Sequence, residues 1–134
     1  MLNREKKYDW VITTAFYSCI HYLYDAIFPL SAVVGGKIVI FQSFQAYSKL
    51  FRENSNMGKH EMLGKAVVEA GLSPMARTAY ESLKSSSFTA RYSDYRVREN
   101  LAAHAISKLD IVEKECQERR ARRDMRASKG NASI

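Results

Sequence analysis

The sequence has few of the residues that interrupt helices or crosslink a chain. Its 134 residues include two prolines, six glycines and two cysteines. The scarcity of proline and glycine favours long helices, and two cysteines without C-x-x-C spacing exclude a zinc module and a disulfide framework. Valine and isoleucine are few and scattered, which argues against a sheet-dominated fold. We therefore expect one helical domain in the cytoplasm.

A secretory leader and a membrane-spanning segment are also not expected. The stretch from Tyr8 to Gly36 contains no lysine or arginine, but His21 and Asp25 lie within it and Pro29 interrupts it. An acidic residue at the centre of a bilayer costs about 2.5–3.5 kcal/mol. The stretch therefore predicts a buried core helix, and no membrane partner is expected.

Positive charge is concentrated at the end of the chain. The net charge is +7, and residues 119–134 hold six lysines and arginines against the single acid Asp124. The pattern predicts a helical body over 1–118 and a basic, flexible tail over 119–134. Such a tail attracts polyanions such as RNA. It also fits a solvated helix end that aids solubility, since it has no aromatic residue to stack on bases.

Apolar residues recur at helical spacing in several segments. These segments are 4–28, 43–54, 59–70, one that begins at 73–74, and 95–118. The first is apolar on nearly every side, which is typical of a central helix surrounded by others. The predicted fold class is all-α, an antiparallel up-and-down bundle of four to five helices.

Local signals mark where these helices begin and end. Pro29 stops the first helix, Ser43 and Ser73 are suited to cap the helices that follow them, and Gly71 fits the position just after a helix. Residues 30–42 form a connection with a turn at Gly35-Gly36, and 37–41 is either a short strand or an extended loop.

The histidines are the first candidates for chemistry. His21 and Asp25 are four residues apart, so they share a helix face. They could act in acid–base chemistry or simply satisfy each other's polarity inside an apolar helix. His60, in "GKHEM", could bind a ligand or cap neighbouring backbone. No further ligands stand at metal-binding spacing, and neither a metal nor a cofactor is expected.

The stretch "SSFTARYSDYRVRENLAAH", residues 86–104, is the second candidate. Arg91, Tyr92 and Tyr95 suit a binding surface for RNA or a partner protein. Arg98 and His104 form an Arg-x5-His pair. Six residues of regular helix place two side chains about 120° apart, so this pair converges only if Arg98 precedes the helix or across a dimer axis.

Three segments in this order resemble the HEPN domain superfamily over roughly residues 9–116. The segments are "AFYSCIHYLYDAI" (15–27), "GKHEM" (58–62) and "AYESLKSSSFTARY" (79–92), followed by a long amphipathic helix. The positions that match the family pattern are Tyr17, His21, His60, Glu61, Tyr80, Leu83, Ser87, Ala90, Arg91 and Tyr92.

The resemblance implies an all-α bundle that often dimerises. Many members are associated with RNA or with a nucleotidyltransferase-like partner protein, in toxin–antitoxin or defence systems. Ribonuclease members carry Arg-x4-6-His near the start of the last helix. Arg98 and His104 fit that spacing, although Glu99 stands where the family has a different polar residue.

Three hypotheses follow for the function. In the first, the chain is a binding module for RNA or a partner protein, with Arg91, Tyr92, Tyr95, His21 and His60 as candidate binding residues. In the second, it is a metal-independent ribonuclease in which His104 transfers protons and Arg98 stabilises the phosphorane. In the third, it is a structural homodimer without a nucleic-acid role.

Overall fold

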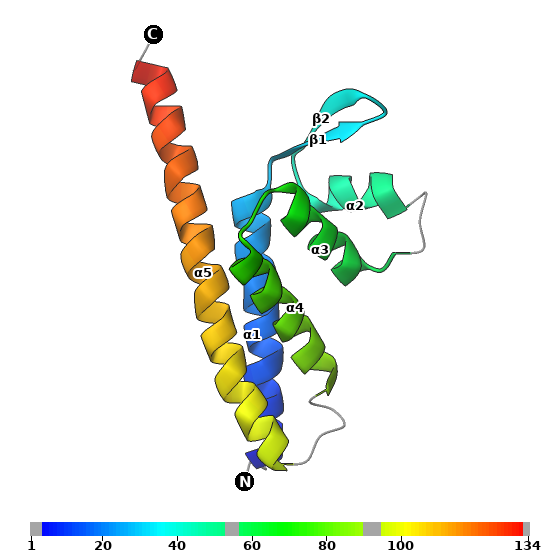
Figure 1. Cartoon of the computed structure of the whole chain (residues 1–134), viewed down its shortest axis with the longest axis vertical. Coiled ribbons are helices and arrows are strands. Elements are labelled where there is room, and N and C mark those ends of the chain that lie inside the picture. The colour runs from blue at the N-terminus through cyan, green and yellow to red at the C-terminus, as the bar shows by residue number, and fades with distance from the viewer. Residues whose placement is uncertain (1–3, 53–56, 90–94, 133–134) are drawn as a thin grey trace.

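The computed structural model describes residues 4–52, 57–89 and 95–132, with side chains described for 7–51, 57–88 and 99–127 (Figure 1). The described ranges contain five helices and one β-hairpin, which confirms the prediction of an all-α helical bundle. In chain order the elements are α1 (Arg4–Ile27), β1 (Leu30–Val34), β2 (Lys37–Phe41), α2 (Phe44–Arg52), α3 (Lys59–Glu69), α4 (Pro74–Thr89) and α5 (Tyr95–Ala132).

Helix α1 lies at the centre of the bundle. It runs alongside α5 and also packs against α4 and α3 (Figure 1). Its buried side is apolar and includes Ile12, Phe16, Cys19, Leu23 and Ile27. Each contact between helices removes apolar surface from water, which is the main favourable term in folding.

One row of α1 faces solvent, contrary to the prediction of a helix covered on nearly every side. Trp10 is 74% exposed and Tyr17 is 57% exposed, and His21 is exposed as well. The reason is architectural: α3, α4 and α5 cover only part of the helix, while α2 and the hairpin lie near one end of it (Figure 1). Aromatic residues on this row are therefore available as a surface.

The connection after α1 is an antiparallel hairpin. Leu30 pairs with Phe41 and Val34 with Lys37, and the turn glycines Gly35 and Gly36 have φ values of 57° and 80°. Two consecutive positive φ values are the geometry of a type I′ turn, which matches the right-handed twist of the strands. Residues 37–41 are thus a strand, and 30–34 form a second strand that the sequence analysis did not predict.

The predicted helix boundaries are confirmed where local chemistry sets them. The hydroxyl of Ser43 accepts a hydrogen bond from the N–H of Ala46 at 3.2 Å, and the hydroxyl of Ser73 accepts one from Ala76 at 3.1 Å. Both are N-cap bonds. Gly71 follows the C-cap of α3 with φ of 76°, a conformation that glycine adopts without steric cost.

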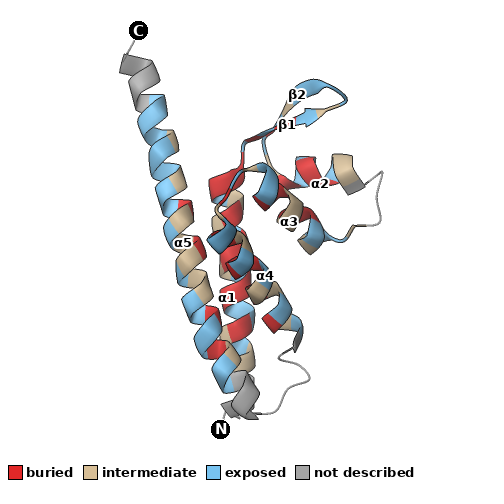
Figure 2. Cartoon of the chain, in the orientation of Figure 1, coloured by how far each residue is buried: buried red, intermediate tan, exposed pale blue. Residues whose placement is uncertain are grey.

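Helix α5 is longer than predicted. The sequence pattern predicts an end near Glu118, whereas the helix continues to Ala132. The predicted boundary between a body over 1–118 and a tail over 119–134 therefore lies inside one helix. The buried positions of α5 end at Cys116, and the side chains described beyond it, up to residue 127, are exposed or half-buried (Figure 2).

Two arginines in this extension contact the helical body. The guanidinium group of Arg119 donates hydrogen bonds at 3.0 and 2.8 Å, and that of Arg123 donates at 3.1 and 3.0 Å. The acceptors are backbone carbonyls at the ends of α1 and α3, namely Ala26, Ala70, Phe28 and Asp25. The last carbonyls of a helix lack partners within it and carry partial negative charge, so a cation stabilises them.

No helix within the described ranges combines the length and the apolar character that crossing a bilayer requires.

Candidate functional site

A small pocket of about 80 Å³ lies where α1, α3 and α4 meet. Its lining comes from all three segments that resemble the HEPN pattern. The lining residues are Thr13, Phe16 and Tyr17 of α1, His60 of α3, and Ser87 and Phe88 of α4. Three stretches that are far apart in the sequence therefore supply one surface.

Packing holds His60 in place at the start of α3. Its ring lies 5.0 Å from the ring of Phe16, with the two planes inclined at 60°. The hydroxyl of Tyr80 donates a hydrogen bond of 2.8 Å to the carbonyl of His60. Burial raises the pKa of Tyr80, so the phenol keeps its proton and remains a donor. Helix α4 thereby positions the first turn of α3.

The charge state of His60 follows from its surroundings. Burial lowers its pKa below the ordinary value, and the positive charges of Lys59 and Lys84 lower it further. A neutral imidazole has one N–H donor and one acceptor nitrogen. The pocket therefore offers a neutral hydrogen-bonding ring beside two cationic side chains.

Exposed aromatic side chains border the pocket. Tyr17 is 57% exposed and Phe88 is 56% exposed, although both line the pocket. Trp10 is 74% exposed and lies two turns before Tyr17 on the same row of α1. Exposed aromatic faces of this kind can stack on planar ligands.

His21 and Asp25 do not form the buried pair that the sequence suggests. Both are exposed, and no ion pair joins them in the part of the chain that the structure describes. The ring of His21 instead lies edge-on to Tyr24, with 6.3 Å between ring centroids. The two side chains do not pair because this row of α1 faces water, which hydrates both of them.

The Arg-x5-His pair lies on one continuous helix. Helix α5 begins at Tyr95, so Arg98 is within its first turn, and His104 is exposed. The helix backbone separates the two positions by about 120°. The structure does not describe the side chains of Tyr95 and Arg98, and Arg91 and Tyr92 lie outside the described residues. The roles of these four residues therefore stay predictions.

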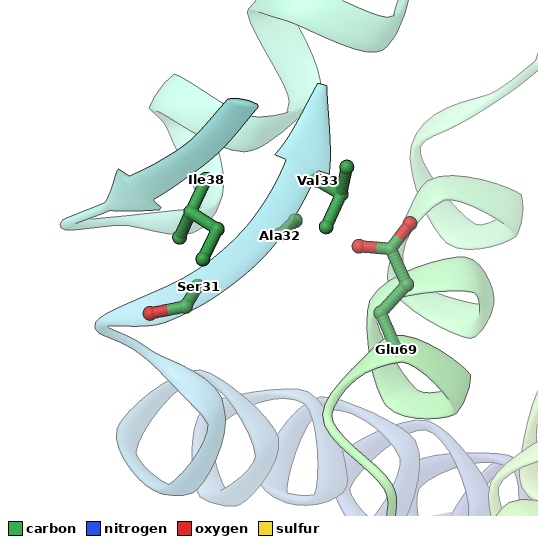
Figure 3. A pocket seen from close by; sticks show the side chains of 5 residues that line it. All are labelled: Ser31, Ala32, Val33, Ile38 and Glu69. Carbon is green, nitrogen blue, oxygen red and sulfur yellow. The ribbon is translucent and has the colours of Figure 1, made fainter. Parts of the chain in front are cut away.

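A second pocket, of about 450 Å³, lies between the hairpin and the end of α3 (Figure 3). A third, of about 240 Å³, lies between the α3–α4 connection and α5, and Glu115, Glu118, Arg119 and Arg122 contribute to its lining. Within it, Glu115 accepts a hydrogen bond of 2.9 Å from the N–H of Ser73. Glu115 is therefore engaged in capping the start of α4.

The described residues contain no group of three or more His, Cys, Asp or Glu side chains that could hold a metal ion. Cys19 and Cys116 are free and buried. Burial raises the pKa of each thiol to about 12, and for Cys19 the neighbouring Cys116 adds to the effect. Such thiols stay protonated and are poor nucleophiles.

The sequence predicts His60 as a binding residue and Tyr17 as a match to the family pattern, but it predicts no aromatic lining residue of this pocket as a ligand contact. Tyr17 and Trp10 belong to an apolar row of α1 that predicts core positions, and Phe88 lies in the stretch 86–104 without a distinguishing spacing. Periodicity shows that a row is apolar, but not which row the neighbouring helices leave open. No protein-family model, curated protein or solved structure matches the chain.

Proposed function

We propose that this chain is a HEPN-like helical binding module, of the kind found in toxin–antitoxin or defence systems. Its ligand is single-stranded RNA, and the binding surface is the pocket between α1, α3 and α4 with its aromatic border. One observation carries the proposal: the three segments that resemble the family pattern meet at this pocket. The pocket combines exposed aromatic side chains with the nearby lysines Lys59 and Lys84 and the neutral ring of His60.

Each element of the surface suits a part of an RNA strand. Unpaired bases stack on exposed aromatic rings, and Tyr17 and Phe88 provide two of them. Lys59 lies on an exposed first turn of α3, where it can meet a phosphate. His60 can donate or accept a hydrogen bond at a base edge or a ribose hydroxyl.

The size of the pocket limits what can enter it. A cavity of about 80 Å³ is far smaller than the several hundred Å³ of a typical small-molecule site. It can admit a functional group, whereas a whole nucleotide must lie on the surface. The proposal therefore places bases against the aromatic border and one polar group of the RNA at His60.

The experiment is a fluorescence-anisotropy titration with a short labelled single-stranded RNA at low salt. Because each base stack contributes about 1–3 kcal/mol, Tyr17→Ala and Phe88→Ala should each weaken binding by about tenfold. Met75→Ala is the matched control, since Met75 is 66% exposed but lies at the start of α4, away from the pocket. No binding at low salt, or equal binding by all four proteins, would contradict the proposal.

The same samples test the ribonuclease hypothesis. It predicts that the wild-type chain cuts RNA in the presence of a chelator and that His104→Ala stops the cleavage. Intact RNA with the wild-type chain excludes this activity and leaves the binding proposal unchanged. Binding is preferred because Arg98 lies inside α5, where six residues of regular helix separate its position from that of His104 by about 120° around the axis.

The structural-homodimer hypothesis makes a different prediction. It requires a stable dimer in sedimentation together with no affinity for RNA. A dimer that also binds RNA at the pocket would fit the binding proposal, since the two properties are independent.

A further inference from the structure

The β-hairpin presents an apolar face to solvent, at the opposite end of α4 from the pocket just described (Figure 1). Val33, Ile38 and Ile40 are 72%, 77% and 60% exposed. Val33 is paired with Ile38, and Ser31 with Ile40. Paired and alternate residues of a hairpin share a face, so three large apolar side chains lie together in water.

The hairpin also has unpaired strand edges. Among the described residues β1 and β2 pair only with each other. Each strand therefore has an outer row of backbone N–H and C=O groups without a strand partner, which is a template for adding another strand.

A pocket lies directly beside this face. Its volume is about 450 Å³, and its lining is Ser31, Ala32, Val33, Ile38 and Glu69. Figure 3 shows the carboxylate of Glu69 directed toward Val33 across the pocket. Lys65 lies 2.8 Å from that carboxylate and balances its charge. The pocket is therefore mainly apolar and large enough to hold side chains of a second chain.

The last turns of α5 add positive charge at the same end of the molecule (Figure 1). Arg126 follows Arg119 by seven residues and thus lies within about 20° of it around the helix. Arg122 is about 60° away on the same side, whereas Asp124 is about 140° away. Because Arg119 contacts the ends of α1 and α3, this side of α5 is the one that faces the body.

Arg122 and Arg126 are not engaged in the fold, although Glu118 lines the same pocket as Arg122. Both are exposed, and neither makes an ion pair or a hydrogen bond within the described part of the chain. Arg119 and Arg123 are already occupied by backbone carbonyls. Two free guanidinium groups at the same end of the molecule as an apolar strand face favour a partner that carries carboxylates.

We propose that this end of the molecule binds an acidic, extended segment of a partner protein. The segment adds a strand to the hairpin, and its alternate apolar side chains cover Val33, Ile38 and Ile40. Its carboxylates pair with Arg122 and Arg126. This surface is separate from the proposed RNA site and does not depend on it.

The open strand edge decides between this occupant and two others. A bilayer interior offers nothing to hydrogen-bond the backbone groups of the edge, and an RNA strand offers little apolar surface to cover isoleucine. An extended polypeptide supplies both the backbone partners and the apolar side chains.

The test is selection of random dodecapeptides from a phage-displayed library on the full chain. The expected peptides alternate apolar and acidic residues. They should bind the wild-type chain about tenfold more tightly than Ile38→Thr/Ile40→Thr, which keeps the β-branched shape but removes apolar surface. Arg122→Gln/Arg126→Gln should weaken binding by a similar factor and reduce its salt dependence, and Ile106→Thr, at an exposed position in the first half of α5, should bind as the wild type does.

Several results would overturn the proposal. They are selection of no peptide, selection of peptides without acidic residues, or equal binding by both double variants and the wild type. Binding of phosphatidylserine vesicles, or of the short RNA, that is lost in both double variants would assign the surface to a membrane or to RNA instead. If Ile38→Thr/Ile40→Thr does not fold, Arg122→Gln/Arg126→Gln decides alone, since both arginines lie outside the core. Tyr17→Ala should leave peptide binding intact, which separates this proposal from the RNA proposal.

Discussion

The hydroxyl of Tyr80 donates a hydrogen bond of 2.8 Å to the backbone carbonyl of His60. Tyr80 is a core residue of α4, only 1% exposed, and His60 is in the first turn of α3. The bond therefore connects the bundle core to the candidate site. It also keeps His60 beside Phe16, whose ring lies 6.2 Å from that of Tyr80.

Removing this hydroxyl should destabilise the fold. In Tyr80→Phe the carbonyl of His60 loses a buried partner, which costs about 1–2 kcal/mol. Urea denaturation followed by circular dichroism measures the loss. Tyr17→Phe is the control, because Tyr17 is exposed and its change should stay within about 0.5 kcal/mol. Equal effects of the two substitutions would show that the bond has no special role.

The lowered pKa of His60 makes stability depend on pH. Because the pKa is lower in the folded chain than its ordinary value of 6.5, the unfolded chain takes up the proton first as the pH falls. The contribution is fully present above the ordinary value and is lost as the pH falls through the folded value. The free energy of unfolding should therefore fall more steeply with acid in the wild type than in His60→Gln. Parallel curves would contradict this assignment.

Arg119 should contribute more to stability than its neighbour Arg120. Its guanidinium donates to the carbonyls of Ala26 and Ala70, whereas Arg120 is exposed. Arg119→Met should lower the free energy of unfolding by about 1.5–3 kcal/mol, since it removes hydrogen bonds from a charged donor. Arg120→Met removes the same charge and should change the free energy of unfolding by less than about 0.5 kcal/mol. Thermal denaturation of the two variants measures the difference. A smaller effect of Arg119→Met than of Arg120→Met would refute the prediction.

The hairpin turn should tolerate asparagine better than alanine. Gly35 has φ of 57°, and an added Cβ would meet no atom within 4 Å. Any loss of stability on substitution therefore comes from the backbone conformation and not from a clash. Gly35→Ala should lower the free energy of unfolding by about 1 kcal/mol. Gly35→Asn should leave it nearly unchanged, because asparagine is a favoured residue of type I′ turns. Urea titration of the two variants is the measurement, and a larger loss with asparagine would argue against this turn type.

Features that depend on local chemistry could be predicted from the sequence. Ser43, Ser73 and Gly71 mark helix boundaries because a cap bond or a positive φ involves only residues a few positions away. The strand at 30–34 was missed although its signal is local: two glycines separate two short apolar runs, which is a hairpin pattern.

Features that depend on packing could not be predicted in the same way. The length of α5 is an example, since its extension contacts the body through Arg119 and Arg123, and their carbonyl acceptors are residues 49 to 98 positions earlier in the chain. The candidate site is another. The motif containing His60 was recognisable, but its position beside Phe16 and Phe88 depends on how three helices meet.

The pairing of the first and last helices has a consequence for biosynthesis. Tyr22 of α1 donates a hydrogen bond to Glu113 of α5, across 91 residues of sequence, and closing so long a loop carries an entropic cost. During translation α1 is made before α5, and the apolar side of α1 that α5 covers stays open until α5 has been synthesised. A nascent chain thus completes this core only after α5 has left the ribosome.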